Sequence, residues 1–281
     1  MIALLMSLSA GAWAADLKGV DPACYDVATE LQADIASGKA DYSEQGQQDF
    51  LLNYFAMATT LSPLHAPVPH EGGHGSLNLE VMVIPALGCN RRLVLSGTKT
   101  EDTNKAPAAP RPRVLFSFQD VGKIKPYAGF GYVPPVPVFG TRNVIVSGEA
   151  GFALRADNGF EWGLRYHATL MKSIAEIATP FSPDDPEELD IFIGSTFGVD
   201  ALFGTRIGED LRPYMAVGFT DASTFFYIGD DAVVSNNTSP YASVTGSLGF
   251  QWTLDKLDFA GEFYTAPGIL YTARLRAGIK L

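Results

Sequence analysis

The last eleven residues of the chain, 271–281, alternate between apolar and polar side chains without a break. In a strand, successive side chains point to opposite faces, so Tyr271, Leu275 and Ile279 share one face. Arg274 and Arg276 share the other face. A terminal strand with this much apolar surface would aggregate in water if its edge stayed unpaired. A closed barrel in lipid pairs every edge, and the alternation therefore favours a closed antiparallel sheet.

This ending resembles the closing strand and assembly signal of bacterial outer-membrane β-barrels, most of which end in Phe where this chain ends in Leu281. The resemblance implies an all-β, closed antiparallel transmembrane barrel in the outer membrane of a Gram-negative bacterium. It also implies three partners, which are outer-membrane lipid, lipopolysaccharide, and the barrel assembly machinery that reads the C-terminal strand.

The N-terminus has the pattern of a secretion signal. Residues 2–8 form a short apolar run, and Ala12 and Ala14 fit an A-x-A cleavage site before Ala15. The run is too short to span a membrane. We therefore expect residues 1–14 to be a removed signal peptide.

Composition excludes two further classes of protein. The chain of 281 residues has 28 Gly and 18% charged residues, which suits many short strands joined by tight turns. No stretch approaches the roughly 20 apolar residues of a membrane-spanning helix. The net charge of −11 makes nucleic acid an improbable partner, because phosphate binding requires clustered Lys and Arg.

Reading backwards from the C-terminus predicts eleven strands. They lie at 75–84, 91–98, 112–118, 125–133, 142–154, 159–175, 189–204, 211–220, 240–254, 257–266 and 269–281. Bacterial single-chain barrels have an even number of strands. The twelfth is therefore assigned to 49–61, although this apolar segment fits a buried helix as well. The prediction is a barrel of about 12 strands over 49–281.

The predicted connections fall into a short set and a long set. With a periplasmic C-terminus, the periplasmic links are 85–90, 119–124, 155–159, 205–210 and 255–256. The opposite links are mostly longer, at 62–74, 99–111, 134–141, 177–188 and 221–239, with only 267–268 short. This asymmetry is typical of outer-membrane barrels.

Five aromatic residues lie beside the predicted periplasmic turns, on the apolar face of their strands. They are Phe160, Trp162, Phe203, Trp252 and Phe259. Aromatic rings gather at the membrane interface, so we interpret them as the periplasmic girdle. The alternative is a row of core aromatics in a soluble sandwich.

The opposite face of the strands carries charge of both signs. The predicted lumen-lining residues are Glu80, Glu149, Glu161, Arg165, His167, Asp200, Glu262, Arg274, Arg276 and Lys280. Such residues either form a packed ion-pair network that closes the barrel or line a polar pore, and the period of two does not separate these alternatives.

The segment 15–48 precedes the barrel and has apolar residues at helical spacing, which predicts a short periplasmic helix. Alternatively, it folds into the lumen as a plug, as in long-chain fatty-acid channels, to which the resemblance is only at the level of the barrel class. Cys24 lies in this segment and Cys89 in the first predicted periplasmic turn. Both thiols would share an oxidising compartment, so a disulfide is expected.

The sequence His70-Glu71-Gly72-Gly73-His74 matches the H-E-x-x-H zinc motif literally. The motif needs a helix, and two central glycines with prolines just before make a helix here improbable. We predict a flexible external loop and no metal site. A looser surface site of His65, His70 and His74 is the alternative.

The predicted function is a passive outer-membrane channel or transporter for a small solute, without catalytic residues or cofactors. The first alternative is a structural or adhesive barrel with a packed lumen and working external loops. A lipid-modifying enzyme is less favoured: it would need a serine beside His167, and Ser173 on the same face lies too far along the strand. The acidic run at 184–190 is interpreted as a solvated loop, with bridging of lipopolysaccharide by divalent ions as the alternative.

Overall fold

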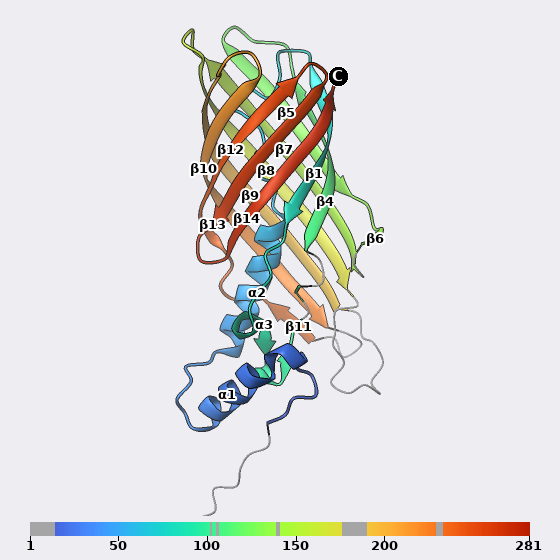
Figure 1. Ribbon diagram of the computed structural model, residues 1–281, viewed down its shortest axis with the longest axis vertical. Helices are drawn as coiled ribbons and strands as arrows, with labels where there is room; N and C mark the ends of the chain where they lie inside the picture. The colour runs from blue at the N-terminus through green and yellow to red at the C-terminus, as the bar shows by residue number, and fades with distance from the viewer. Residues whose placement is uncertain (1–14, 102, 105–106, 139–140, 176–189, 229–232) are drawn as a thin grey trace, which may run out of the picture.

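The computed structural model describes residues 15–101, 103–104, 107–138, 141–175, 190–228 and 233–281. The predicted signal peptide and most of the acidic run lie outside these ranges. Within them, ten long antiparallel strands form a closed barrel (Figure 1). They are β1 (Gly75–Val83), β4 (Ala108–Ser117), β5 (Ile124–Val133), β7 (Thr141–Arg155), β8 (Phe160–Ala175), β9 (Asp190–Thr205), β10 (Leu211–Ile228), β12 (Ala242–Leu254), β13 (Leu257–Ala266) and β14 (Leu270–Lys280).

The first and last strands of the barrel close it. β14 pairs with β1 over seven residues, and this register places Arg276 opposite Glu80. Two short strands extend the sheet outside the ring: β6 (Pro137–Val138) pairs with β7, and β11 (Val233–Asn236) pairs with the end of β10. The closed antiparallel barrel is thus confirmed, with ten strands in the described residues rather than twelve.

The predicted twelfth strand is wrong, because residues 49–61 lie largely in helix α2 (Glu44–Thr59). Ser43 caps this helix by accepting a hydrogen bond from the Gly46 N–H. Its apolar residues are buried in continuous runs such as Leu51–Leu52 and Ala56–Met57. A helix satisfies its own backbone, so it can pack in the barrel without a strand edge to pair with.

The predicted strand at 91–98 is also wrong. These residues form the end of α3 (Cys89–Arg92), then β2 (Leu93–Val94) and η2 (Leu95–Gly97), and β2 pairs with β3 (Lys99–Thr100) outside the barrel. With η1 (Pro22–Cys24) and α1 (Tyr25–Ala36) they form a small folded unit. We call residues 15–59 together with 85–101 the helical unit. No helix in the described ranges is long and apolar enough to cross a membrane.

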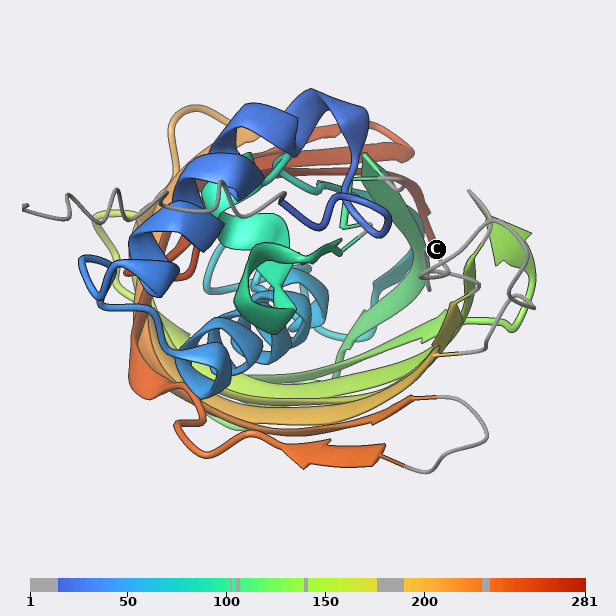
Figure 2. The same ribbon diagram turned by 90° about the horizontal axis from the view of Figure 1, so that it is seen from below.

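The barrel has two different ends. At the short-turn end, the links 118–123, 156–159, 206–210 and 255–256 join neighbouring strands, and the C-terminus lies there too (Figure 1). At the long-loop end, β5 ends and β7 begins, β8 ends and β9 begins, and β10 ends and β12 begins. The helical unit lies across the long-loop end, away from the C-terminus (Figures 1 and 2). The predicted periplasmic C-terminus and the predicted periplasmic helix therefore cannot both hold.

The chain crosses the barrel through its lumen. α2 ends at the long-loop side, whereas β1 begins at the short-turn side, where Ser76 pairs with Lys280. Residues 60–70 connect the two, and all of them are buried. We call residues 60–70 the lumenal thread. It corrects the prediction that 62–74 is an external loop, and the link at 85–90 correspondingly lies at the long-loop end.

Candidate functional site

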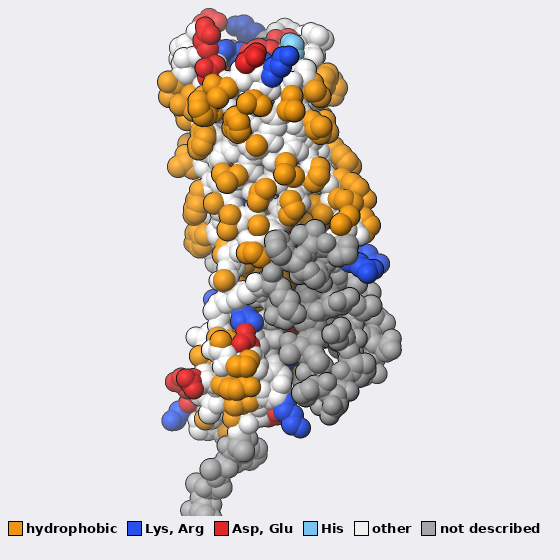
Figure 3. All heavy atoms as spheres, turned by 45° about the vertical axis from the view of Figure 1, so that its right-hand side comes forward, with side chains coloured by type: hydrophobic (Ala, Val, Ile, Leu, Met, Phe, Trp, Pro, Cys, Tyr) orange, Lys and Arg blue, Asp and Glu red, His pale blue; other side chains and the backbone are white. Residues whose placement is uncertain are grey.

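The exterior of the barrel is a continuous apolar band (Figure 3). Outward side chains such as Leu248, Leu275 and Tyr271 are each more than half exposed. The predicted girdle residues lie at the short-turn end of this band. Phe160, Trp162, Phe203 and Trp252 are exposed there, and Phe259 packs against Trp252 with ring centroids 6.4 Å apart. This surface is suited to lipid.

The inward face carries the charged residues. Nine of the ten predicted lumen residues are at most 5% exposed: Glu80, Glu149, Glu161, Arg165, His167, Asp200, Glu262, Arg274 and Arg276. The tenth, Lys280, is only half-buried at the short-turn end. Charged groups that line an open aqueous pore would be accessible to solvent, so the burial indicates a packed interior.

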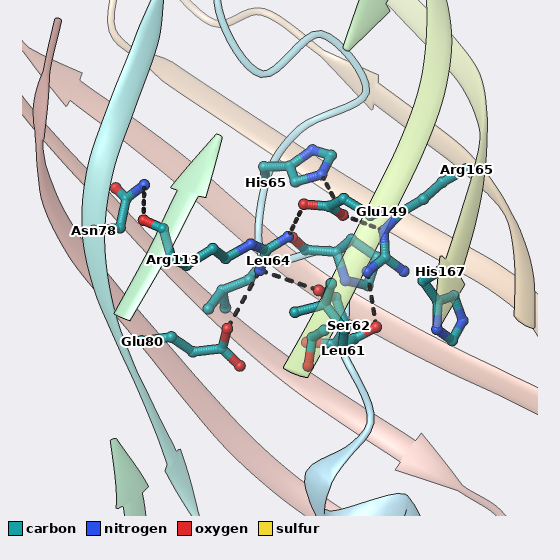
Figure 4. Close-up of polar contacts among 12 residues, drawn as sticks. Leu61, Ser62, Leu64, His65, Asn78, Glu80, Arg113, Glu149, Arg165 and His167 are labelled. Carbon is teal, nitrogen blue, oxygen red and sulfur yellow. Dashed lines mark hydrogen bonds and ion pairs between the residues drawn. The ribbon is translucent and has the colours of Figure 1, made fainter. Parts of the chain in front are cut away.

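Ion pairs link the strands of the wall, and one of them reaches across β5 from β4 to β7. Glu149 on β7 accepts from Arg113 on β4 and Arg165 on β8, each at 2.5 Å (Figure 4). Arg165 continues the chain of contacts to Asp200 on β9, also at 2.5 Å. Two further pairs, Arg111 with Glu80 and Arg276 with Asp258, complete the set of pairs at 2.5 Å in the described wall.

The arginines of the wall also bind backbone carbonyls of the lumenal thread. Arg165 donates to the Leu61 carbonyl at 2.8 Å, and Arg113 donates to those of Ser62 and Pro63 at 3.2 and 2.7 Å. Further along, Arg212 donates to the carbonyls of Val68 and Pro69, and Arg274 donates to that of Thr60. Each guanidinium has five donors, so it can serve a carboxylate and the thread together.

Acceptors on the wall bind the N–H groups of the thread at alternate residues. Leu64 donates to Glu262, Ala66 to Gln251, Val68 to Glu161 and His70 to Ser117, with lengths of 2.9 to 3.3 Å. This period of two is that of an extended chain. Pro63, Pro67 and Pro69 have no N–H, so the thread offers more acceptors than donors. An arginine-rich wall matches this imbalance.

Each of the ten barrel strands contributes a side chain that contacts the thread. The contacts come from Ser76, Arg113, Tyr127, Glu149, Arg165, Thr196, Arg212, Gln251, Glu262 and Arg274. The thread is thus fastened on all sides, and backbone groups that would be costly to bury unpaired have partners.

Sequence reasoning missed several of these wall residues. Arg111, Arg113, Arg212 and Asp258 are all buried, and each binds the thread or a charged residue of the wall. Each has the inward parity of its strand, so the alternation that identified Glu80 and Arg274 would have found them. The thread showed no alternation of apolar and polar residues that would have identified it. Its backbone bonds to side chains of the wall and not to the backbone of a neighbouring strand.

The histidines are held apart. His65 lies 3.4 Å from Glu149, and His70 bonds the Ser76 hydroxyl at 2.8 Å, whereas His74 is exposed near the C-terminus. The H-E-x-x-H segment is not helical, and Gly73 adopts φ +83° in the turn that leads into β1. No group of residues in the described ranges is arranged to hold a metal ion. His167 lies in the lumen, with Nε2 3.6 Å from Asp200.

A disulfide joins Cys24 to Cys89 and connects the end of η1 to the start of α3. Beside it, Arg92 donates to Asp21 at 3.1 Å. The Ala23 N–H, which donates to the same carboxylate, lowers the pKa of Asp21; slight burial opposes this and Arg92 adds to it. The helical unit therefore has its own covalent and electrostatic stabilisation outside the barrel.

The helical unit is also attached to the loop between β11 and β12. Asp49 of α2 accepts from the N–H and the hydroxyl of Thr238, at 2.8 and 2.7 Å. Asn53, one turn further on, accepts from the Tyr241 N–H at 2.8 Å. These contacts fix α2 in the long-loop end of the barrel.

A closed antiparallel barrel with an apolar exterior and a charged interior defines a transmembrane β-barrel of the bacterial outer-membrane class. The predicted outer-membrane location follows from this class. No protein-family model and no curated protein matches the chain.

Among solved structures, the chain is similar to the translocator domain of the autotransporter NalP from Neisseria meningitidis. The identity is 10% over 76% of this chain and 90% of that one, with a TM-score of 0.47. It is also similar to Ail, the attachment invasion locus protein of Yersinia pestis, with 10% identity over 75% of this chain and 100% of that one and a TM-score of 0.35. Likenesses at this level do not define a family.

Proposed function

We propose that the protein is a non-conducting membrane anchor, which holds its disulfide-bonded helical unit at the cell surface and fills its own lumen with the thread. This proposal develops the alternative of a structural or adhesive barrel with a packed lumen, which the sequence analysis left open. The observation that supports it most directly is the course of the chain, which enters the lumen from the helical unit and leaves it where β1 begins. Passage of a small solute stays a prediction.

Topology supports a permanent closure. Because the helical unit lies at one end of the barrel and β1 begins at the other, some segment of chain must always cross the lumen. Within the helical unit, the Cys24–Cys89 disulfide joins the part that precedes the thread to the part that follows β1. The N-terminal chain therefore cannot slip back through the barrel while this bond is intact.

Energetics support the same conclusion. Arg212 and Arg274 have no carboxylate within 4 Å among the described residues, and their hydrogen-bond partners include carbonyls of the thread. Withdrawal of the thread would leave two buried guanidinium groups short of acceptors. A hydrogen bond to a charged group contributes about 1.5–3 kcal/mol, so these contacts favour the filled lumen.

The orientation follows the general rule that short turns and the C-terminus of such barrels face the periplasm. The helical unit is then external. The test is an epitope inserted at Gly38, in the open turn after α1, compared with a control epitope between Asp157 and Asn158 at the short-turn end. On intact cells we expect antibody to bind the first and not the second, and the reverse pattern would refute the proposed display.

A second measurement addresses conduction separately. Purified protein reconstituted into a planar bilayer should show no steady conductance, because the thread and the wall ion pairs fill the lumen. Steady single-channel conductance from well-folded protein would refute the closed lumen and favour the solute channel. Heat-modifiable migration on a gel verifies the fold of the sample used.

A further inference from the structure

Two basic side chains point outward from the barrel near its long-loop end. Arg142 on β7 and Lys172 on β8 are exposed, and the register pairs Lys172 with Val144, two residues from Arg142 on the same face. Diagonal neighbours of this kind are about 7–8 Å apart, within reach of one another for long side chains. Among the described outward side chains of the barrel strands, these two are the exposed basic residues.

Two other basic side chains near a barrel end are paired with acids, in contrast to these two. Lys125 pairs with Asp120 at 2.6 Å, and Arg155 pairs with Glu71 at 2.6 Å, both at the short-turn end. Within the described part of the chain, neither Arg142 nor Lys172 has a carboxylate within 4 Å. Among the described residues, these two neighbouring cations therefore form a locally positive site on the exterior of the barrel.

The surface toward the membrane centre is apolar. Val146 and Leu170 are paired across the two strands, two residues further into the barrel than the pair of Val144 and Lys172. Leu170 is 56% exposed. Tyr132, which pairs with Val146, is exposed as well, and so is Tyr166, four residues from Leu170 on the same face of β8. A ligand here meets cations at the rim of the apolar band and hydrocarbon surface below them.

We propose that Arg142 and Lys172 bind a phosphate of lipid A, the phosphorylated glycolipid of the outer leaflet, while its acyl chains cover Leu170 and Tyr166. A guanidinium contacts phosphate oxygens bidentately, and the ammonium adds a compact charge. The position at the rim of the band matches the height of a lipid headgroup. The proposal shares its orientation with the proposed display, but a binding assay in detergent does not depend on orientation, so the two can fail separately.

The test measures binding of lipid A to the purified full-length barrel in detergent by native mass spectrometry. The variant is Arg142→Gln with Lys172→Gln. Its matched control is Lys123→Gln with Lys256→Gln, which removes the same charge from exposed positions at the short-turn end. We expect the first variant to bind bis-phosphorylated lipid A about tenfold more weakly or worse, and the control to bind as the wild type does.

Three outcomes would overturn the proposal. The first is equal binding by wild type and the Arg142/Lys172 variant, which would mean that these side chains only extend toward the headgroup region, as interfacial cations do. The second is unchanged binding of dephosphorylated lipid A by the wild type. The third is equal retention of phosphatidylglycerol, which would indicate a general phospholipid site. All variants are surface changes, and heat-modifiable migration verifies that each is folded.

Discussion

Arg113 is the residue whose removal tests the packed lumen most directly. It is 0% exposed and donates to two carbonyls of the thread, Ser62 and Pro63, as well as to Glu149 and Glu80. In an Arg113→Ala variant, Glu149 keeps Arg165 and Glu80 keeps Arg111, each at 2.5 Å. The two carbonyls lose these donors.

The expected loss follows from these contacts. An unsatisfied buried acceptor costs about 1–3 kcal/mol, and breaking a buried ion pair costs about 3–5 kcal/mol when no partner remains. Because both carboxylates keep another arginine, the carbonyls dominate the loss. We expect the free energy of unfolding to fall by about 3 kcal/mol.

The assay is urea unfolding of the barrel in lipid vesicles, followed by heat-modifiable gel migration. The matched control is Val114→Ala, the next residue of β4, whose side chain is 44% exposed on the lipid face. Protease cleavage within residues 60–70 reports release of the thread. If Arg113→Ala unfolds at the same urea concentration as Val114→Ala and the thread stays protected, the thread is not held by the wall as described.

The other predictions concern the helical unit and its attachment. Protein purified without reductant should have no titratable thiol, and free thiols in wild type would contradict the disulfide. Replacing Cys24 and Cys89 with Ser should destabilise the unit by about 4 kcal/mol on the chain-entropy model, measured by limited proteolysis of α1. Because the folded pKa of Asp21 is lowered, its contribution to stability is present above the unfolded pKa of about 3.9 and is lost as pH falls through the folded value. Proteolysis of the unit should therefore increase in acid for wild type, with Asp21→Asn showing a smaller change. Asp49→Ala should remove both bonds to Thr238 and increase protease cleavage of residues 237–241, with the barrel still folded; unchanged cleavage would mean that the loop is held by other contacts.

Much of the barrel could be predicted because an alternating pattern has a direct structural meaning. Side chains at i and i+2 share a face, so the pattern in 159–175 identified both the lipid face at Tyr166 and the inward face at Arg165 and His167. The short turns followed from the same strands. The disulfide between Cys24 and Cys89 was also expected. The expectation placed both cysteines at the same end of the barrel as the C-terminus, whereas they lie at the opposite end.

The rest required the tertiary structure. An apolar run such as 49–61 has the composition of either a helix or a strand. Ten other strands close the barrel, so no strand edge remains for this segment to pair with, and it forms a helix. The route of residues 60–70 through the lumen was equally hidden. Its backbone bonds go to side chains such as Arg113 and Glu262 that are far away in sequence, so no local period records them. The sequence by itself determined which residues face lipid and which face the lumen, because residues i and i+2 of a strand share a face. The number of strands, the filled lumen and the end at which the helical unit lies were decided only when distant segments met.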